Sequence, residues 1–193
     1  MLVALLLSAA LATVQTSPAA ALAFTPCPSE AASGFSCAAL SVPLDRSGTV
    51  GGSVELSVER LDSSPTHAAP SKAAVVALAG GPGQAALPLA AGMAKTIAAA
   101  LTTRDLLVFD QRGTGRSGPL ACASLEGAEA LGSIGQAFER CAVQIGARRR
   151  AYTTQESVAD IEALRQAGGY EKLVLFGVSY GTKVALEYAE RYP

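Results

Sequence analysis

Histidine and tryptophan are scarce in this chain of 193 residues, which has one histidine, His67, and no tryptophan. Charged residues make up only 16% of the sequence, and the net charge is −1. This charge supplies no basic field that would gather nucleic acid. The four cysteines form no CxxC pair, so the spacing does not indicate a zinc site. We therefore expect no nucleic-acid partner, no metal and no other cofactor.

The first 23 residues have the pattern of a secretory signal peptide. An apolar run ends near Val14, and the sequence ALA that ends at Ala23 fits the small-x-small rule for signal peptidase. The run is shorter than the roughly 20 residues that span a membrane, although the usual basic residues after Met1 are missing. We expect a signal peptide at 1–23, a secreted or periplasmic domain at 24–193, and no stable membrane association after cleavage.

Export would place the cysteines in an oxidising compartment, where disulfides form. The local pairs are Cys27 with Cys37 and Cys122 with Cys141, but four cysteines allow three connectivities. The sequence does not choose among them. The second pair lies within Pro119–Arg150, where the helical pattern is weak.

Two kinds of strand are predicted. Phe35–Asp45 and Ser53–Asp62 alternate between apolar and polar residues and are separated by glycine-rich turn residues, which indicates an antiparallel hairpin. Ala73–Ala79, Leu106–Asp110 and Lys172–Gly177 are continuously apolar, which is typical of strands covered by helices on both faces.

Helical patterns lie between the buried strands. The alanine-rich Gln84–Leu101 is one candidate, and Thr154–Ala167 is better marked, with apolar residues at three- and four-residue spacing. Thr153 or Thr154 can cap its start, and Gly168 ends it. Strand and helix alternate, so we expect an α/β fold with a mostly parallel sheet led by an antiparallel hairpin. With 50% hydrophobic residues, the chain suits one globular domain or part of one.

The sequence GVSYG at 177–181 carries the clearest chemical signal. It follows an apolar strand directly and precedes the helical run TKVALEYAERY, which is the setting of a nucleophilic serine at a sharp strand-to-helix turn. The following helix directs its amide end toward the same place. We predict that Ser179 is a catalytic nucleophile. The alternative is a glycine-flanked serine in an ordinary turn.

A second motif, GGPG at 80–83, ends the first buried strand. A nucleophilic serine needs amide donors for the oxyanion, one of them from the residue after the nucleophile, here Tyr180. The other comes from a glycine-rich loop. Because Pro82 has no N–H, Gly81 is the best candidate and Gly80 the next. The loop lacks the lysine of a phosphate-binding loop and the spacing of a dinucleotide fingerprint.

The third motif, DQRGTGRSG at 110–118, directly follows a buried strand. We expect Asp110 to form a structural ion pair with Arg112 or Arg116 beneath the site. Asp110 is not expected to be the catalytic acid, because in this fold the acid follows the serine in the chain and the histidine follows the acid.

GGPG, DQRGTGRSG and GVSYGT, in this order, resemble the prolyl aminopeptidases of the α/β-hydrolase superfamily and the related secreted tripeptidyl aminopeptidases. The similarity covers roughly Cys27–Pro193. It implies an α/β-hydrolase fold and a serine exopeptidase that releases residues or short peptides from free amino termini, with Ser179 as nucleophile and 80–83 as the oxyanion loop. Prolyl aminopeptidases usually have histidine where this chain has Ala79, which favours the tripeptidyl branch or a more distant, esterase-like one.

An acid and a histidine are missing after the predicted nucleophile. Residues 180–193 contain Glu187 and Glu190, both in the following helix, and no histidine. His67 lies in a proline-rich connection, where we expect it to be exposed and without a catalytic role. We therefore expect the amino-terminal half of a hydrolase, inactive alone, whose substrate is a peptide or a small acyl compound. The alternatives are an ester or lactone hydrolase and a non-catalytic hydrolase remnant.

Overall fold

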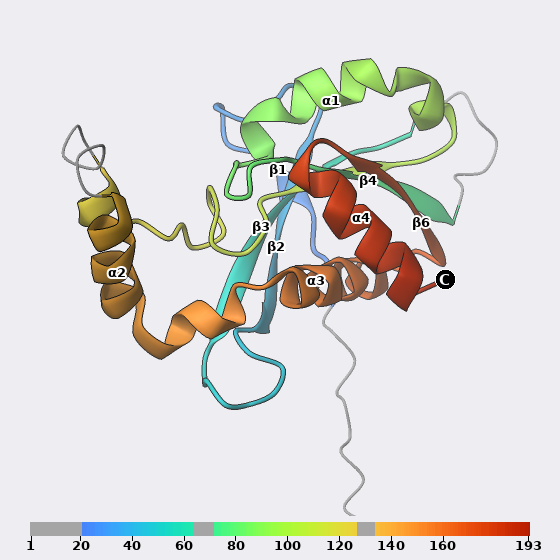
Figure 1. The fold of residues 1–193 in the computed structure, drawn as a ribbon. Coiled ribbons are helices and arrows are strands. Elements are labelled where there is room, and N and C mark those ends of the chain that lie inside the picture. Colours follow the sequence, from blue (N-terminus) through green and yellow to red (C-terminus); the bar gives the residue numbers. More distant parts are fainter. Residues whose placement is uncertain (1–20, 64–71, 127–133) are drawn as a thin grey trace, which may run out of the picture.

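The computed structural model describes residues 21–63, 72–126 and 134–193 (Figure 1). Most of the expected signal peptide and all of the connection that carries His67 lie outside these residues. Within the three ranges, no helix has both the length and the apolar character needed to cross a bilayer.

A six-stranded mixed sheet, in the order β1-β2-β3-β5-β4-β6, organises the chain. The strands are β1 (Thr25–Pro26), β2 (Ser36–Pro43), β3 (Ser53–Leu61), β4 (Ala73–Leu78), β5 (Leu106–Phe109) and β6 (Lys172–Gly177). The helices are α1 (Ala90–Thr96), α2 (Ile134–Ile145), α3 (Thr154–Ala167) and α4 (Tyr180–Arg191), with 3₁₀ turns η1 (Leu87–Leu89), η2 (Ala98–Thr102), η3 (Ala123–Leu125) and η5 (Gly146–Ala151).

The predicted hairpin is confirmed by strands β2 and β3. They pair antiparallel with Leu40 opposite Leu56 and Val42 opposite Val54. These apolar residues are buried while their neighbours face outward, as alternation requires. Strand β3 also pairs antiparallel with β5, which joins the hairpin to the rest of the sheet.

The continuously apolar strands form the parallel part of the sheet, as predicted. Strand β4 lies between β5 and β6 and runs parallel to both. Helix α1 covers one face of the sheet, and α3 and α4 cover the other (Figure 1). Side chains of β4 alternate between the two cores: Val76 packs in the α3 and α4 core, and Val75 in the α1 core. Burial on both faces explains the absence of polar residues from β4.

Helix α3 has the predicted bounds. The Thr153 side chain caps it by accepting a hydrogen bond from the Glu156 amide at 3.2 Å. The helical stretch predicted over Gln84–Leu101 is confirmed in part: it begins at Leu87, and only α1 within it is α-helical, flanked by the 3₁₀ turns η1 and η2. The amides of Ala86 and Leu87, at its start, donate to the Asp110 carboxylate.

Helix α2 lies away from the sheet (Figure 1) and is fastened by a disulfide between Cys122 and Cys141. The Ser124 hydroxyl also donates to the Ala137 carbonyl at 2.9 Å. The other disulfide joins Cys27 to Cys37, next to the pairing of β1 with β2. Both local pairings are therefore present, out of the three connectivities that the sequence allows.

Candidate active site

Ser179 occupies a sharp turn between β6 and α4, with φ 51° and ψ −118°. Apart from glycines, no other residue in the described ranges has a positive φ. Such backbone conformations cost free energy and concentrate at functional sites. The turn is closed by the Gly181 amide, which donates to the Val178 carbonyl at 2.8 Å. The predicted strand-turn-helix setting is confirmed, and the catalytic role of Ser179 stays a prediction.

The two glycines of the GVSYG motif allow this turn to pack closely. A Cβ on Gly177 would lie 2.5 Å from the Gly181 carbonyl oxygen. A Cβ on Gly181 would lie 2.5 Å from the Leu78 carbonyl oxygen and 2.8 Å from that of Ala79. Larger residues would therefore push the serine turn away from the end of β4.

The GGPG loop lies against the serine. A Cβ on Gly80 would lie 3.0 Å from the Cβ of Ser179, 3.5 Å from its Oγ and 3.1 Å from the Val178 carbonyl oxygen. Gly80 thus leaves the space that the serine side chain occupies. Tyr180 is the first residue of α4, where amides have no acceptor within the helix. Gly81 and Tyr180 stay the predicted oxyanion donors.

The expected ion pair between Asp110 and Arg112 or Arg116 is wrong. One carboxylate oxygen of Asp110 accepts hydrogen bonds from the amides of Ala86 at 2.7 Å and Leu87 at 3.0 Å, and the other accepts from the Arg116 amide at 2.7 Å. These backbone donors satisfy the buried carboxylate without a guanidinium. Asp110 therefore joins the segment after β4 to the loop after β5.

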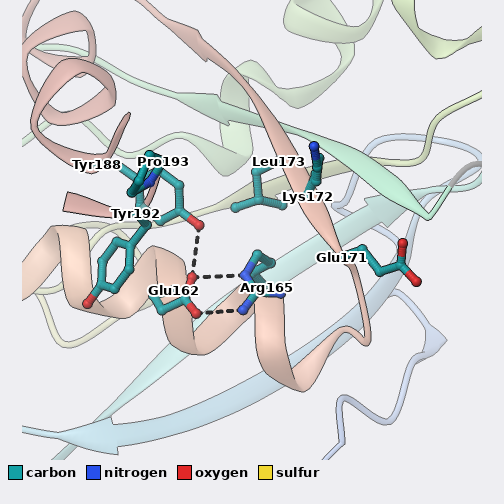
Figure 2. Close-up of a pocket in the computed structure, with 8 residues that line it drawn as sticks. All are labelled: Glu162, Arg165, Glu171, Lys172, Leu173, Tyr188, Tyr192 and Pro193. Carbon is teal, nitrogen blue, oxygen red and sulfur yellow. Dashed lines mark hydrogen bonds and ion pairs between the residues drawn. The ribbon is translucent and has the colours of Figure 1, made fainter. Parts of the chain in front are cut away.

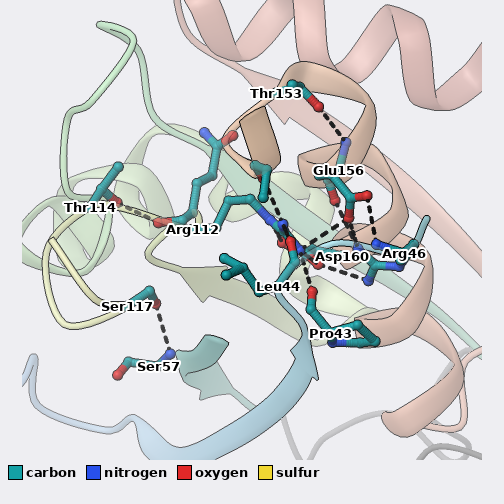
Figure 3. Close-up of polar contacts among 12 residues, drawn as sticks. Pro43, Leu44, Arg46, Ser57, Arg112, Thr114, Ser117, Thr153, Glu156 and Asp160 are labelled. Atoms are coloured by element: carbon teal, nitrogen blue, oxygen red, sulfur yellow. Dashed lines mark hydrogen bonds and ion pairs between the residues drawn. The ribbon is translucent and has the colours of Figure 1, made fainter. Parts of the chain in front are cut away.

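Arg112 instead binds Asp160 of α3 inside the protein (Figure 3). The remaining guanidinium donors reach backbone carbonyls of three segments: Pro43 at 3.1 Å, Leu44 at 2.6 Å and Ala151 at 2.8 Å. The structure thus fixes the loop after β5 through one side chain. This role of Arg112 and Asp160 was not predicted from the sequence.

A cavity of about 300 Å³ lies beside the GGPG loop. Its walls are Pro82 and Gly83, the 111–114 segment, Leu120, three residues at the start of α3 (Tyr152, Thr153 and Ser157), and Tyr180. The hydroxyls of Thr154 and Tyr180 share a hydrogen bond of 2.8 Å, which links the first turns of α3 and α4. The cavity therefore adjoins both elements predicted to stabilise an oxyanion.

A second cavity, of about 360 Å³, lies near the start of β6 (Figure 2). Glu162 accepts hydrogen bonds there from Arg165 and from the Tyr188 hydroxyl at 2.9 Å. The hydrogen bond from Arg165 lowers the pKa of this carboxyl. Because Ser179 follows the opposite end of β6, this cavity is separate from the candidate active site.

One group in the described part of the chain gathers three potential metal ligands: Cys27, Cys37 and Glu59. The two sulfurs are joined in a disulfide and are therefore not thiolate ligands. Glu59 is almost fully buried, and its Oε2 has no hydrogen-bond partner. Burial raises the pKa of Glu59, and the charge of Arg116 offsets part of this effect. These residues do not fit a metal site.

The described ranges contain no histidine that can serve as a base, since His67 lies outside them. Of the two glutamates after Ser179, Glu187 pairs with Lys183 at 3.6 Å on the surface of α4 and Glu190 is exposed. Neither is placed to orient an imidazole against the serine. The described ranges therefore contain the predicted nucleophile and no side chain that the geometry places as its base or acid.

Comparison with known proteins supports the same fold. A tripeptidyl aminopeptidase of Streptomyces lividans is 28% identical over 177 residues, covering 81% of this chain and 33% of that protein. The serine protease Hip1 of Mycobacterium tuberculosis H37Rv is 31% identical over 134 residues, covering 59% of this chain and 26% of that protein. A proline iminopeptidase of Neisseria gonorrhoeae is 32% identical over 119 residues, covering 62% of this chain and 28% of that protein.

The chain thus spans between a quarter and a third of the length of these relatives. Residues 73–193 match the model of the alpha/beta hydrolase fold. This range begins with β4 and includes the GGPG loop, the loop after β5 and the serine turn. The chain belongs to the α/β-hydrolase family.

Proposed function

We propose that this protein is a secreted serine aminopeptidase that releases single residues or short peptides from free amino termini. The 193 residues contribute its nucleophile, Ser179, and its oxyanion donors, the amides of Gly81 and Tyr180. The observation that carries the proposal is the strained turn at Ser179, which the GGPG loop approaches closely.

In this proposal, the Oγ of Ser179 attacks the carbonyl carbon of the scissile peptide bond. The carbonyl oxygen becomes an oxyanion and accepts hydrogen bonds from the two amides, which are fixed in place before the reaction. The amino end of α4 points toward the same charge and stabilises it further. An acyl-enzyme forms when the amine leaves, and water hydrolyses it.

The attack requires a base that takes the serine proton and an acid that orients this base. We place both outside these 193 residues, because the described glutamates of α4 lie on its surface and the matched part of this chain covers only 33% of the tripeptidyl aminopeptidase and 26% of Hip1. The segment alone is then expected to be inactive.

Three observations support peptide cleavage outside the cell. The relatives include a tripeptidyl aminopeptidase, a proline iminopeptidase and a serine protease. Two disulfides connect all four cysteines, as in proteins of oxidising compartments. The first 23 residues have the pattern of a signal peptide.

The test compares hydrolysis of tripeptidyl p-nitroanilides and p-nitrophenyl butyrate by the full-length protein, together with labelling by a fluorophosphonate. We expect peptide hydrolysis and labelling at Ser179, both lost in Ser179→Ala and retained in Ser41→Ala, a control on an exposed position of β2. Hydrolysis of the ester alone would favour the esterase alternative. Absence of turnover and of labelling would favour a non-catalytic remnant.

A further inference from the structure

The cavity beside the GGPG loop is lined by polar side chains that have no hydrogen-bond partner among the residues that the structure describes. Gln111 and Ser157 line it, and each is 7% exposed. Neither the Gln111 amide nor the Ser157 hydroxyl forms a hydrogen bond with any residue in the described ranges. The polar atoms of these two side chains are not among the fully buried, unpaired atoms of the described ranges, so they open onto the cavity and can bind water or a ligand there.

The charged residue of this wall is already neutralised. Arg112 directs its donors to Asp160 and to three backbone carbonyls, and so leaves none for a ligand. The remaining lining side chains carry no formal charge. The cavity therefore offers neutral donors and acceptors, and it suits an uncharged polar group better than a carboxylate or an ammonium.

The first turns of two helices border the same space. Thr153 caps α3 and Tyr180 begins α4, and both residues line the cavity. Amides in the first turn of a helix favour oxygen acceptors such as a carbonyl. The Gln111 side chain adds an N–H donor and a carbonyl acceptor. These can pair with the carbonyl and the N–H of one peptide unit.

We propose that this cavity is a substrate subsite that binds a peptide unit next to the scissile bond, with the Gln111 amide as its specificity-determining contact. This inference rests on the proposed peptidase function and adds the residues that select peptides over simple esters. An alkyl ester placed here would cover the Gln111 amide and displace its water without pairing it, which is the kind of mismatch that discriminates strongly between substrates. The volume of about 300 Å³ suits a small part of a substrate rather than a long acyl chain.

The first experiment measures peptide binding without catalysis. Trialanine amide is titrated by calorimetry into full-length Ser179→Ala, and then into the same protein with Gln111→Leu, Gln111→Glu or Ser157→Ala. We expect the dissociation constant to rise about tenfold or more with Gln111→Leu, and less with Ser157→Ala. Gln155→Leu is the matched control, because Gln155 is exposed on the first turn of α3 and does not line the cavity.

The second experiment compares kcat/KM for a tripeptidyl p-nitroanilide with kcat/KM for p-nitrophenyl acetate. Gln111→Leu is expected to lower the ratio about tenfold, mainly through KM for the peptide. Thermal unfolding of each variant shows whether it is folded. If Gln111→Leu does not fold, the same two measurements on Ser157→Ala decide whether the cavity binds the peptide. Peptide hydrolysis with an unchanged ratio and unchanged binding would overturn the subsite and leave the peptidase intact. Ester hydrolysis without peptide binding would overturn both.

Discussion

Arg112 and Asp160 form a bidentate ion pair inside the protein, with Nε to Oδ2 and Nη2 to Oδ1 distances of 2.7 Å each. Arg46 reaches the same carboxylate from the end of the hairpin, at 2.8 Å. Because both carboxylate oxygens of Asp160 are paired, the helix α3 holds the loop after β5 and the chain after β2 in one position. This arrangement sets the wall of the cavity beside the GGPG loop.

Asp160→Asn is expected to destabilise the protein strongly. The substitution leaves the Arg112 guanidinium buried without its carboxylate, so the free energy of unfolding falls by about 3 kcal/mol or more. Urea denaturation of the full-length protein measures this loss. Glu190→Gln, an exposed carboxylate on α4, is the control and should change stability little. A loss below about 1 kcal/mol for Asp160→Asn would contradict the buried pair.

Gly80→Ala is expected to impair the serine more than the fold. The new Cβ would crowd the Ser179 side chain and the Val178 carbonyl, so fluorophosphonate labelling of the full-length protein should slow about 100-fold. Gly92→Ala is the control, because a Cβ there meets nothing within 4 Å. It lies in α1 and should stabilise the helix slightly. Unchanged labelling of Gly80→Ala would show that the loop moves aside.

Glu59→Gln is expected to stabilise the protein at neutral pH. Burial raises the pKa of Glu59 above its ordinary value of 4.5, so ionisation of this acid opposes folding. The free-energy cost of ionising Glu59 in the folded protein is absent below the pKa that Glu59 has in the unfolded chain. It grows as the pH rises from that value through the higher pKa of the folded protein. Urea denaturation at several pH values should show the advantage of Glu59→Gln increasing from about pH 4 to pH 7. Exposed Glu55→Gln should show no such trend.

Reduction of the bond between Cys122 and Cys141 is expected to release α2. Helix α2 lies apart from the sheet and exposes Phe138 and Val143, so the disulfide supplies much of its attachment. Replacing both cysteines with serine should cost about 3 kcal/mol by the chain-entropy model. Hydrogen exchange should rise first in Ile134–Ile145. If exchange rose equally in β4, the disulfide would be supporting the whole domain.

The sequence predicted the strands well because their environments differ. Apolar and polar residues alternate in β2 and β3, which indicates one buried face per strand. The continuous apolar run of β4 indicates that both of its faces are buried. The order of strands in the sheet has no such local signal. The start of the first helical stretch at Leu87 was missed because it depends on Asp110, whose carboxylate accepts the amides of Ala86 and Leu87 and is distant in the sequence.

The site was predicted in part for a similar reason. The turn at Ser179 follows from short-range constraints within GVSYG, and these are visible in the sequence. The partner of Arg112 is distant in the chain and was assigned to Asp110, the nearest carboxylate in the motif. A signal for Asp160 does exist, since it lies between the buried Ala159 and Ile161 of α3, where a charge requires a partner.

The position of β4 between β5 and β6 also bears on how the serine turn is expected to fold. The hairpin of β2 and β3 closes through local contacts and can form early. The pairing of β4 with β6 joins residues as distant as Ala73 and Lys172, so it pays the loop-closure entropy of the whole intervening chain. Ser179 lies directly beyond this pairing. Ser179, which alone among the non-glycine residues of the described ranges has a positive φ, is therefore expected to adopt its conformation only after β6 has paired with β4.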